Sequence, residues 1–151
     1  MRVLIQRVKE ASVTVEGRIQ GAVSSGLLVF LGIAKADNAA DADYLLDKTL
    51  NLRVFPDEAG KMNRNVTEAG GALLIVSQFT LYADCRRGRR PSFDPAAPPE
   101  RALELYNYFV EKAGKGPVPV ETGLFQATME VRLLNDGPVT ILIDSADRSA
   151  R

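Results

Sequence analysis

The sequence predicts an α+β fold, with one compact domain built from mixed, barrel-like β-sheets and two main helices. The length of 151 residues fits a single domain and leaves little room for two. With 46% hydrophobic and 25% charged residues, the chain has enough apolar material for one core. The expected elements run strands, helix, strand, helix, strands, an order that indicates α+β rather than a regularly alternating parallel sheet.

The first third of the chain is expected to contain three strands and a hairpin turn. Residues 2–8 are predicted to form one strand, and residues 12–15 and 18–20 a short hairpin about a turn at residues 16–17. Residues 27–31 are apolar without alternation, a pattern typical of a central strand that is covered on both faces.

The later strands are expected on either side of a long loop. Residues 72–82 have the composition of a buried strand, and residues 83–98 form a polar loop rich in Arg, Gly and Pro. Apolar and polar residues alternate over residues 127–133, which predicts a half-buried strand. A turn at residues 135–138 then leads into a last strand over residues 139–143.

Two amphipathic helices are predicted. The first covers residues 39–52, with Asp37 or Asn38 as its cap, and the positions at helical spacing are Tyr44, Leu45, Lys48 and Leu52. The second opens at residues 98–100, where proline is tolerated in the first turn. Its apolar face consists of Ala102, Leu105, Tyr106 and Phe109.

The composition excludes several kinds of catalytic chemistry. The chain has no histidine, so a Ser-His-Asp or Cys-His triad, a histidine general base and a His-ligated zinc site are all excluded. Its one cysteine, Cys85, cannot form an intrachain disulfide, which favours a reducing compartment. An incidental thiol is a better interpretation of Cys85 than a nucleophile. We predict no metal and no cofactor.

Charge and hydropathy indicate where the protein works and what it contacts. Charged residues interrupt the first apolar stretch, so no signal peptide is expected, and the longest uncharged apolar run, residues 26–34, is too short to span a bilayer. Nineteen basic and nineteen acidic residues cancel, so any contact with nucleic acid must be local. We expect a cytoplasmic protein with no membrane and no DNA partner. Its domain covers residues 1–145, and a polar, frayed tail follows over residues 146–151.

The first candidate site is the polar end of an otherwise apolar strand, at residues 77–80. Two hydroxyls, an amide and exposed backbone N–H groups can converge there on a substrate carbonyl; they belong to Ser77, Gln78, Phe79 and Thr80. The same polar groups can serve only to satisfy neighbouring backbone, and the residues alone do not decide between these interpretations.

The second candidate is a loop with four arginines about one glycine. Such runs are usually solvated surface. Arginine also pairs bidentately with phosphate, glycine permits close approach, and an aromatic ring can stack on a base. We therefore interpret this loop as an RNA contact made by Arg86, Arg87, Arg89, Arg90 and Phe93.

The third candidate is the segment at residues 135–140, which by itself is a turn between strands. The alternative is functional: a cis bond between Gly137 and Pro138 would aim two successive carbonyls the same way.

Together these three segments resemble the D-aminoacyl-tRNA deacylase family, also known as D-tyrosyl-tRNA deacylases. Four further segments fit the same pattern, at residues 5–8, 11–15, 61–63 and 122–125. The similarity runs from Met1 to about Asp144, in register and without large gaps. Each motif is weak alone, but the set in this order is highly specific.

The resemblance implies a homodimer with its two active sites at the subunit interface. In the family, the segment at Ser77, Gln78, Phe79 and Thr80 is catalytic and lines the pocket for the 3′-terminal adenosine of aminoacyl-tRNA. Gly137-Pro138 is expected to reach into that pocket from the partner subunit as a Gly-cisPro motif, with Arg7 fixing its orientation. Cys85 replaces the usual threonine, and Gln126 stands where a small residue is common.

The implied reaction is hydrolysis of D-aminoacyl-tRNA to free amino acid and tRNA. Backbone carbonyls can leave room for hydrogen where an L-residue places its Cβ, a scheme that rejects L rather than recognising D. Glycine has no Cβ, so glycyl-tRNA is expected to be a substrate. Attack by water, assisted by the ribose 2′-OH, needs only positioning and an oxyanion hole. The rival mechanism, with the Thr80 hydroxyl as nucleophile, has no evident base.

The residues alone leave two other functions open. A related editing deacylase with relaxed chirality would act on L-aminoacyl-tRNA, although the segment at residues 77–80 argues against it. A non-catalytic tRNA-binding module would use the arginine loop alone and would bind with a steep salt dependence.

Overall fold

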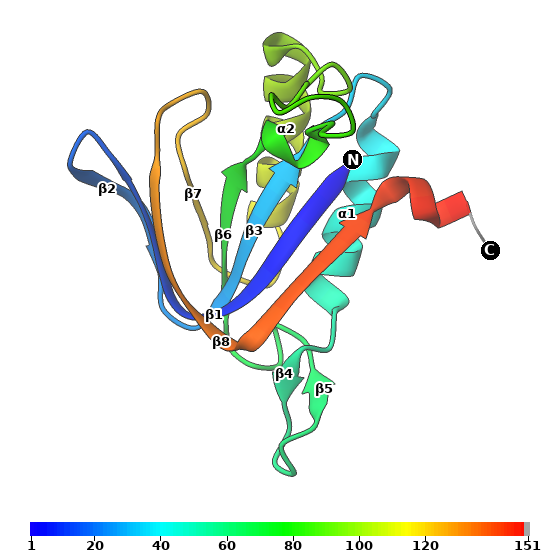
Figure 1. The fold of residues 1–151 in the computed structure, drawn as a ribbon. Coiled ribbons are helices and arrows are strands. Elements are labelled where there is room, and N and C mark those ends of the chain that lie inside the picture. Colours follow the sequence, from blue (N-terminus) through cyan, green and yellow to red (C-terminus); the bar gives the residue numbers. More distant parts are fainter. Residues whose placement is uncertain (150–151) are drawn as a thin grey trace.

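A six-stranded mixed sheet curls into a nearly closed barrel, and two helices pack beside it (Figure 1). The computed structural model describes residues 1–149. The curled sheet contains β1 (Arg2–Val15), β2 (Arg18–Val23), β3 (Gly26–Gly32), β6 (Ala72–Ser77), β7 (Val120–Thr122) and β8 (Glu130–Asp144). The remaining elements are α1 (Ala39–Asn51), the hairpin β4 (Phe55–Pro56) and β5 (Met62–Arg64), the 3₁₀ helix η1 (Phe79–Tyr82), α2 (Pro99–Gly114) and the 3₁₀ helix η2 (Ser145–Ser149). The predicted α+β fold is confirmed.

The order of the main path is β2-β1-β3-β6-β7, and β8 pairs with β1. The pairs β3–β6 and β6–β7 are parallel, whereas β1 pairs antiparallel with β2, β3 and β8. The barrel nearly closes where β2 meets β7. Gly21 of β2 and Thr122 of β7 lie so close that a Cβ added to Gly21 would be 2.4 Å from the Thr122 carbonyl oxygen.

The prediction of two separate strands within residues 2–15 is wrong, because β1 is continuous. Its first half pairs with β3 and its second half with β2, while β8 follows the other edge of both halves. The predicted turn at residues 135–138 is likewise a bend inside one long strand, β8. Pairing between β1 and β8 therefore keeps each of them one continuous strand, although local sequence signals predict a break in each.

The strand predicted over residues 72–82 ends at Ser77, and η1 follows. The cause lies in the neighbouring strand, which ends at Gly32. The side chain of Leu81 lies over that glycine, where an added Cβ would be 3.0 Å from the Leu81 Cβ. The backbone N–H of Gln78 still donates to the Leu31 carbonyl, at 2.8 Å, before the chain folds across the end of β3.

Both predicted helices are present. Asn38, not Asp37, caps α1, in a capping box with Asp41, whereas the Asp37 carboxylate accepts from the Ala34 N–H. The residues that α1 fully buries are Ala42, Leu45, Leu46 and Thr49, of which only Leu45 was predicted. The predicted residues Tyr44 and Leu52 are partly buried and pack against the same core. α2 buries Leu105, Tyr106 and Phe109 as predicted, and Ala113 in addition.

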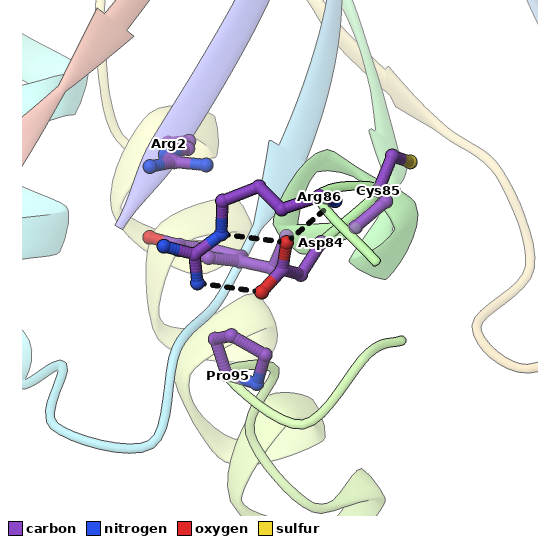
Figure 2. A pocket seen from close by; sticks show the side chains of 7 residues that line it. Arg2, Asp84, Cys85, Arg86 and Pro95 are labelled. Atoms are coloured by element: carbon purple, nitrogen blue, oxygen red, sulfur yellow. Dashed lines mark hydrogen bonds and ion pairs between the residues drawn. The ribbon is translucent and has the colours of Figure 1, made fainter. Parts of the chain in front are cut away.

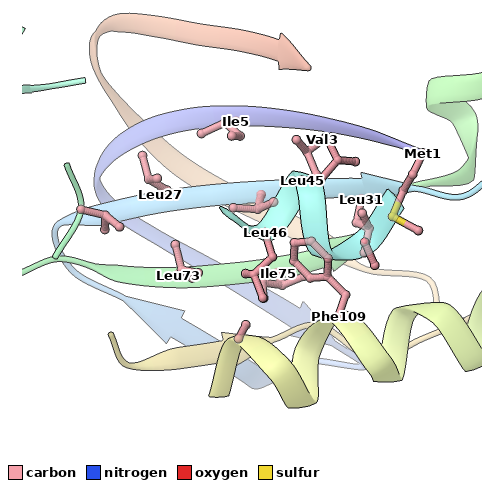
Figure 3. Close-up of a cluster of buried hydrophobic side chains, with 14 of the residues drawn as sticks. Met1, Val3, Ile5, Leu27, Leu31, Leu45, Leu46, Leu73, Ile75 and Phe109 are labelled. Atoms are coloured by element: carbon pink, nitrogen blue, oxygen red, sulfur yellow. The ribbon is translucent and has the colours of Figure 1, made fainter. Parts of the chain in front are cut away.

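Two apolar clusters fill the molecule. The larger one lies between the sheet and the helices, where Leu27 and Leu31 of β3 pack with Leu45 of α1 and Phe109 of α2 (Figure 3). The smaller one contains Leu28 of β3 on the opposite face of the sheet. β3 is therefore covered on both faces, as its unbroken apolar run predicts.

The chain beyond β8 is ordered as far as it is described. Residues 145–149 form η2, and the Ser145 N–H donates to the Met1 carbonyl at 2.8 Å. The tail expected to be frayed over residues 146–151 is instead helical over residues 146–149, and residues 150–151 lie outside the described part. Among residues 1–149, no helix has the length and apolar character needed to cross a bilayer.

Candidate active site

A cavity of about 610 Å³ opens at the carboxyl end of β6. Its walls come from η1, from the segment leading into α2, and from the chain between β7 and β8. Among its lining residues are Ser77, Gln78, Phe79, Phe93, Phe125 and Met129. The rings of Phe79 and Phe93 meet edge to face, with centroids 5.0 Å apart. The cavity thus joins an apolar, aromatic wall to the polar end of a strand, as small-molecule sites commonly do.

The predicted segment at residues 77–80 lies at the mouth of this cavity. Phe79 and Thr80 are the first residues of η1, where helical N–H groups have no acceptor in the helix. No acceptor within residues 1–149 contacts either N–H group. The Gln78 side-chain amide donates to the Thr80 hydroxyl, which forms no other hydrogen bond in the described part of the chain. Two free backbone donors therefore lie beside a hydroxyl.

The segment around Gly137 is fixed by Arg7 and Asn135. Arg7 is 9% exposed, and its Nε donates to the Asp136 carbonyl at 2.8 Å while its Nη1 donates to the Val54 carbonyl. The Asn135 side chain accepts from the Val139 N–H at 2.8 Å and donates to the Val139 carbonyl at 3.1 Å, which closes the bend. The Gly137–Pro138 peptide bond is cis.

The structure does not bring the two predicted motifs together within one chain. Arg7 pairs with Leu27 at one end of β3, whereas Ser77 pairs with Leu31 near the other. Four residues along a strand span roughly 13 Å. Figure 1 shows the bend of β1 and β8 at one end of the sheet and the chain after β6 at the other. A single subunit therefore presents an aromatic cavity and a rigid, exposed Gly-Pro bend as separate features.

Comparison with known proteins identifies the family of this chain. The sequence profile of D-Tyr-tRNA(Tyr) deacylases matches residues 4–144, a range that includes both motifs. The chain belongs to this family. The D-aminoacyl-tRNA deacylase of Solibacter usitatus is 65% identical over 151 residues, the full length of both chains. That of Koribacter versatilis is 59% identical over 145 residues, which cover 96% of this chain and 97% of the relative. The protein is accordingly a hydrolase, a deacylase of this family.

Solved structures share the fold of this chain. The structure of a c-Myc DNA unwinding element binding protein is 41% identical, with a TM-score of 0.91, over 95% of this chain and 98% of that one. A probable eukaryotic D-amino acid tRNA deacylase shares the fold at a TM-score of 0.80 and 17% identity, with the same coverage. The predicted barrel-like α+β architecture thus matches that of a deacylase.

The arginine loop of the deacylase lies next to the cavity. Asp84 and Ser92 exchange backbone hydrogen bonds of 2.7 and 3.0 Å, which close the loop at its base. Phe93 faces the cavity, whereas the four predicted arginines are exposed. Arg86 is bound to the Asp84 carboxylate. Of the predicted RNA-contacting residues, the structure therefore brings only Phe93 into the cavity itself.

Sequence reasoning missed several residues of the cavity. Phe125 and Met129 line the cavity. Met129 lies in the segment predicted to form a strand, residues 127–133, and Phe125 lies just before it. Tyr106 supports Phe125, with ring centroids 5.6 Å apart, and its hydroxyl donates to the Ile75 carbonyl. Burial raises the pKa of Tyr106 to about 12, which keeps the phenol protonated at neutral pH. The fit of residues 122–125 to the family was the signal that could have placed Phe125 at the site.

Proposed function

We propose that this deacylase cleaves the ester of D-aminoacyl-tRNA, and of glycyl-tRNA, to free amino acid and tRNA. L-aminoacyl-tRNA is rejected by the Gly137-Pro138 segment of the partner subunit. The observation that carries this proposal is the family match over residues 4–144, which covers the aromatic cavity and the buried Arg7 that holds the Gly-Pro bend.

The cavity at the end of β6 suits the 3′-terminal adenosine. Its volume of about 610 Å³ lies within the range of small-molecule sites. Phe79, Phe93 and Phe125 offer aromatic surface to a base, which is how proteins commonly hold unpaired nucleotides. With the adenosine there, the aminoacyl ester on its ribose would lie toward Ser77, Gln78 and the start of η1.

The catalytic step is attack of water on the ester carbonyl. The free N–H groups of Phe79 and Thr80 support stabilisation of the oxyanion that forms. The vicinal ribose 2′-OH orients or activates the water, so the protein supplies position rather than a base. Gln78 holds the Thr80 hydroxyl in place through its amide. Ser77 is the remaining polar side chain of the segment and lines the same cavity.

A homodimer would complete the site. β8 is hydrogen-bonded to β1 along one edge, and the described chain offers no partner strand for its other edge. It also exposes large apolar side chains, with Leu134 at 51% and Leu142 at 58%. Unpaired edges and exposed apolar side chains favour association. A second copy can supply the Gly-Pro bend that lies roughly 13 Å along the sheet from the cavity in its own chain.

The chiral filter follows from the rigidity of that bend. Two side chains hold the ends of the bend: Arg7 donates to the Asp136 carbonyl, and Asn135 donates to the Val139 carbonyl. The Gly137 and Pro138 carbonyls between these ends then cannot move aside for the Cβ of an L-residue, whereas the hydrogen of a D-residue or of glycine fits. The side chain of the amino acid then points to solvent, so many D-amino acids are accepted. The rival deacylase with relaxed chirality would lack this discrimination.

Hydrolysis of three tRNA esters tests the proposal directly. Catalytic amounts of protein should release amino acid from D-tyrosyl-tRNA and glycyl-tRNA, and should leave L-tyrosyl-tRNA intact. Release of tyrosine from both stereoisomers would identify the relaxed-chirality deacylase instead. Binding of tRNA without release from any ester would leave the non-catalytic module as the function. Stable glycyl-tRNA beside rapid loss of the D-ester would contradict steric exclusion.

Replacement of Thr80 by alanine separates the two mechanisms. We expect a loss in kcat of less than about tenfold, because the hydroxyl helps to position the segment and does not attack the ester. Removal of a true nucleophile costs on the order of 10⁴-fold or more. Single-turnover rates at saturating enzyme, with tRNA binding measured in parallel, distinguish these results. A collapse of the rate with unchanged binding would make Thr80 the nucleophile.

We place this reaction in the cytoplasm, where aminoacyl-tRNA is used in translation, with aminoacyl-tRNA as the partner of the dimer. The arginine loop at Arg86, Arg87, Arg89 and Arg90 supports contact with the tRNA backbone, since all four side chains are exposed beside the cavity. The absence of a membrane partner and of a DNA partner stays a prediction. The 41% identical structure is named for a DNA unwinding element, and that name describes that protein alone.

A further inference from the structure

A second, open cavity of about 620 Å³ lies on the other side of the wall that bounds the adenosine cavity. Figure 2 shows its lining residues, with Asp84 and Arg86 facing each other between Arg2 and Pro95. The side chain of Cys85 points away from this pair. Neither the catalytic segment nor the Gly-Pro bend lines this cavity, so the proposed hydrolysis leaves it without a role.

The two cavities share their wall. η1 begins at Phe79, which lines the adenosine cavity, and ends at Tyr82, which lines the second one. Pro95 and Ala96 are consecutive residues, about 3.8 Å apart, and face the second and the first cavity respectively. An RNA strand whose last nucleotide fills the first cavity can therefore place its penultimate nucleotide at the second.

Asp84 and Arg86 form an ion pair in the lining of the second cavity, with the Arg86 side chain 87% exposed. The Asp84 Oδ1 accepts from the Arg86 Nε at 2.9 Å and from its backbone N–H at 3.0 Å, and Oδ2 accepts from Nη2 at 2.6 Å. These bonds hold the pKa of Asp84 at about 2, so the carboxylate accepts hydrogen bonds at neutral pH and donates none. The backbone bonds between Asp84 and Ser92 anchor the pair to the shared wall.

The pair leaves open a specific pattern of donors and acceptors. A carboxylate has about four acceptor positions and a guanidinium five N–H groups. Three acceptor positions of Asp84 are used, so Oδ2 retains one. The Nη1 of Arg86 forms no hydrogen bond within residues 1–149, and Nη2 keeps a second N–H. The pair therefore presents one acceptor beside several donors, the order in which guanine presents its Watson–Crick edge.

Cytosine complements this pattern. Its edge carries the N4 amino donor beside two acceptors, N3 and O2, and Asp or Glu is the usual acceptor for N4. Uracil has an acceptor and a donor in the reversed order, so it faces Asp84 with an oxygen and Arg86 with an N–H. Arg2 adds a cationic surface for the base: it lies 4.5 Å over the Tyr82 ring and donates to Asp144 and to the Leu81 carbonyl.

We propose that this second cavity binds the penultimate nucleotide of the tRNA, the cytidine of the CCA end, and that Asp84 and Arg86 read its base. The inference rests on the proposed function, because the adenosine cavity must hold the terminal nucleotide. It separates Arg86 from its neighbours: Arg87, Arg89 and Arg90 contact phosphate, whereas Arg86 contacts a base edge.

Two D-tyrosyl-tRNAs that differ only at the penultimate position, cytidine or uridine, test this assignment. The wild-type enzyme should cleave the uridine form with a kcat/KM lower by roughly tenfold to hundredfold, the usual discrimination of a bidentate base contact. In Arg86→Gln the ratio between the two tRNAs should fall to about one. Arg87→Gln is the matched control, because it should weaken both tRNAs by one factor and keep the ratio.

The outcomes separate this inference from the proposed function. D-tyrosyl-adenosine ester lacks the penultimate nucleotide, so its cleavage by the wild-type enzyme reports on the adenosine cavity alone. Cleavage of this ester together with equal rates on both tRNAs would overturn the base contact and leave the deacylase function intact. An Arg86→Gln enzyme that keeps the wild-type ratio would also overturn it. Failure to cleave the ester and the tRNA would overturn both proposals.

Discussion

Replacement of Arg7 by methionine should reduce kcat/KM for D-tyrosyl-tRNA by about a hundredfold and lower the free energy of unfolding by roughly 2 to 6 kcal/mol. The guanidinium is buried and donates to two carbonyls, of Val54 and Asp136, which would lose their donors. Each buried acceptor left without a partner costs about 1–3 kcal/mol. The bend at Gly137 would then shift, and a misplacement of about 1 Å can cost about a hundredfold in rate.

Two further variants show that geometry, and not charge, causes this effect. Arg7→Lys keeps the charge but lacks the planar fork that reaches both carbonyls, so it should recover only part of the activity. Arg18→Met, at an exposed position of β2, is the control and should change the free energy of unfolding by less than about 0.5 kcal/mol. Denaturant unfolding and steady-state kinetics measure both properties. Wild-type kcat/KM in Arg7→Met would show that the bend needs no support from Arg7.

The parts of the fold that local rules determine could be predicted from the sequence. The second helix begins at residues 98–100 and buries Leu105, Tyr106 and Phe109, because proline in the first turn and helical spacing act within one segment. β3 is covered on both faces, as its unbroken apolar run indicates. The Glu16-Gly17 turn joins β1 and β2, with positive φ at both residues.

The errors share one physical cause, which is pairing with distant residues. β1 is one strand because β8 spans both of its halves, and no signal within residues 2–15 reports that partner. β6 stops at Ser77 because Leu81 needs the space over Gly32.

The candidate site also has parts that the sequence predicts and parts that only the folded chain shows. The motifs at residues 77–80 and 135–140 could be found in the sequence because their unusual polar and turn residues are contiguous. The cavity could not, because Phe93, Phe125 and Met129 reach it from segments that meet only in the folded chain. The separation of the two motifs along β3 is also a property of strand register, and it is what makes a second subunit necessary to the proposed site.

Replacement of Gly137 by alanine should abolish discrimination between D- and L-tyrosyl-tRNA and lower kcat/KM by about a hundredfold or more. The φ of this residue is +152°, and an added Cβ would lie 2.7 Å from the backbone nitrogen of Val139, closer than real Cβ contacts allow. The bend must therefore open, and its carbonyls move from the positions that exclude an L-residue. Gly17→Ala is the matched control, since its φ is +76° but nothing lies within 4 Å of the added Cβ.

Mixed dimers extend this prediction to the subunit arrangement. Gly137→Ala chains retain an intact cavity, and Ala127→Trp chains, in which the indole fills the cavity, retain an intact bend. If the bend acts in the partner's cavity, each mixed dimer contains one complete site, and exchange of subunits should restore about half of the wild-type activity per mixed dimer. If both features act within one chain, no mixture recovers activity, because every site carries a defect. Recovery would therefore establish both the homodimer and the route by which a bend at one end of the sheet selects the substrate at the other.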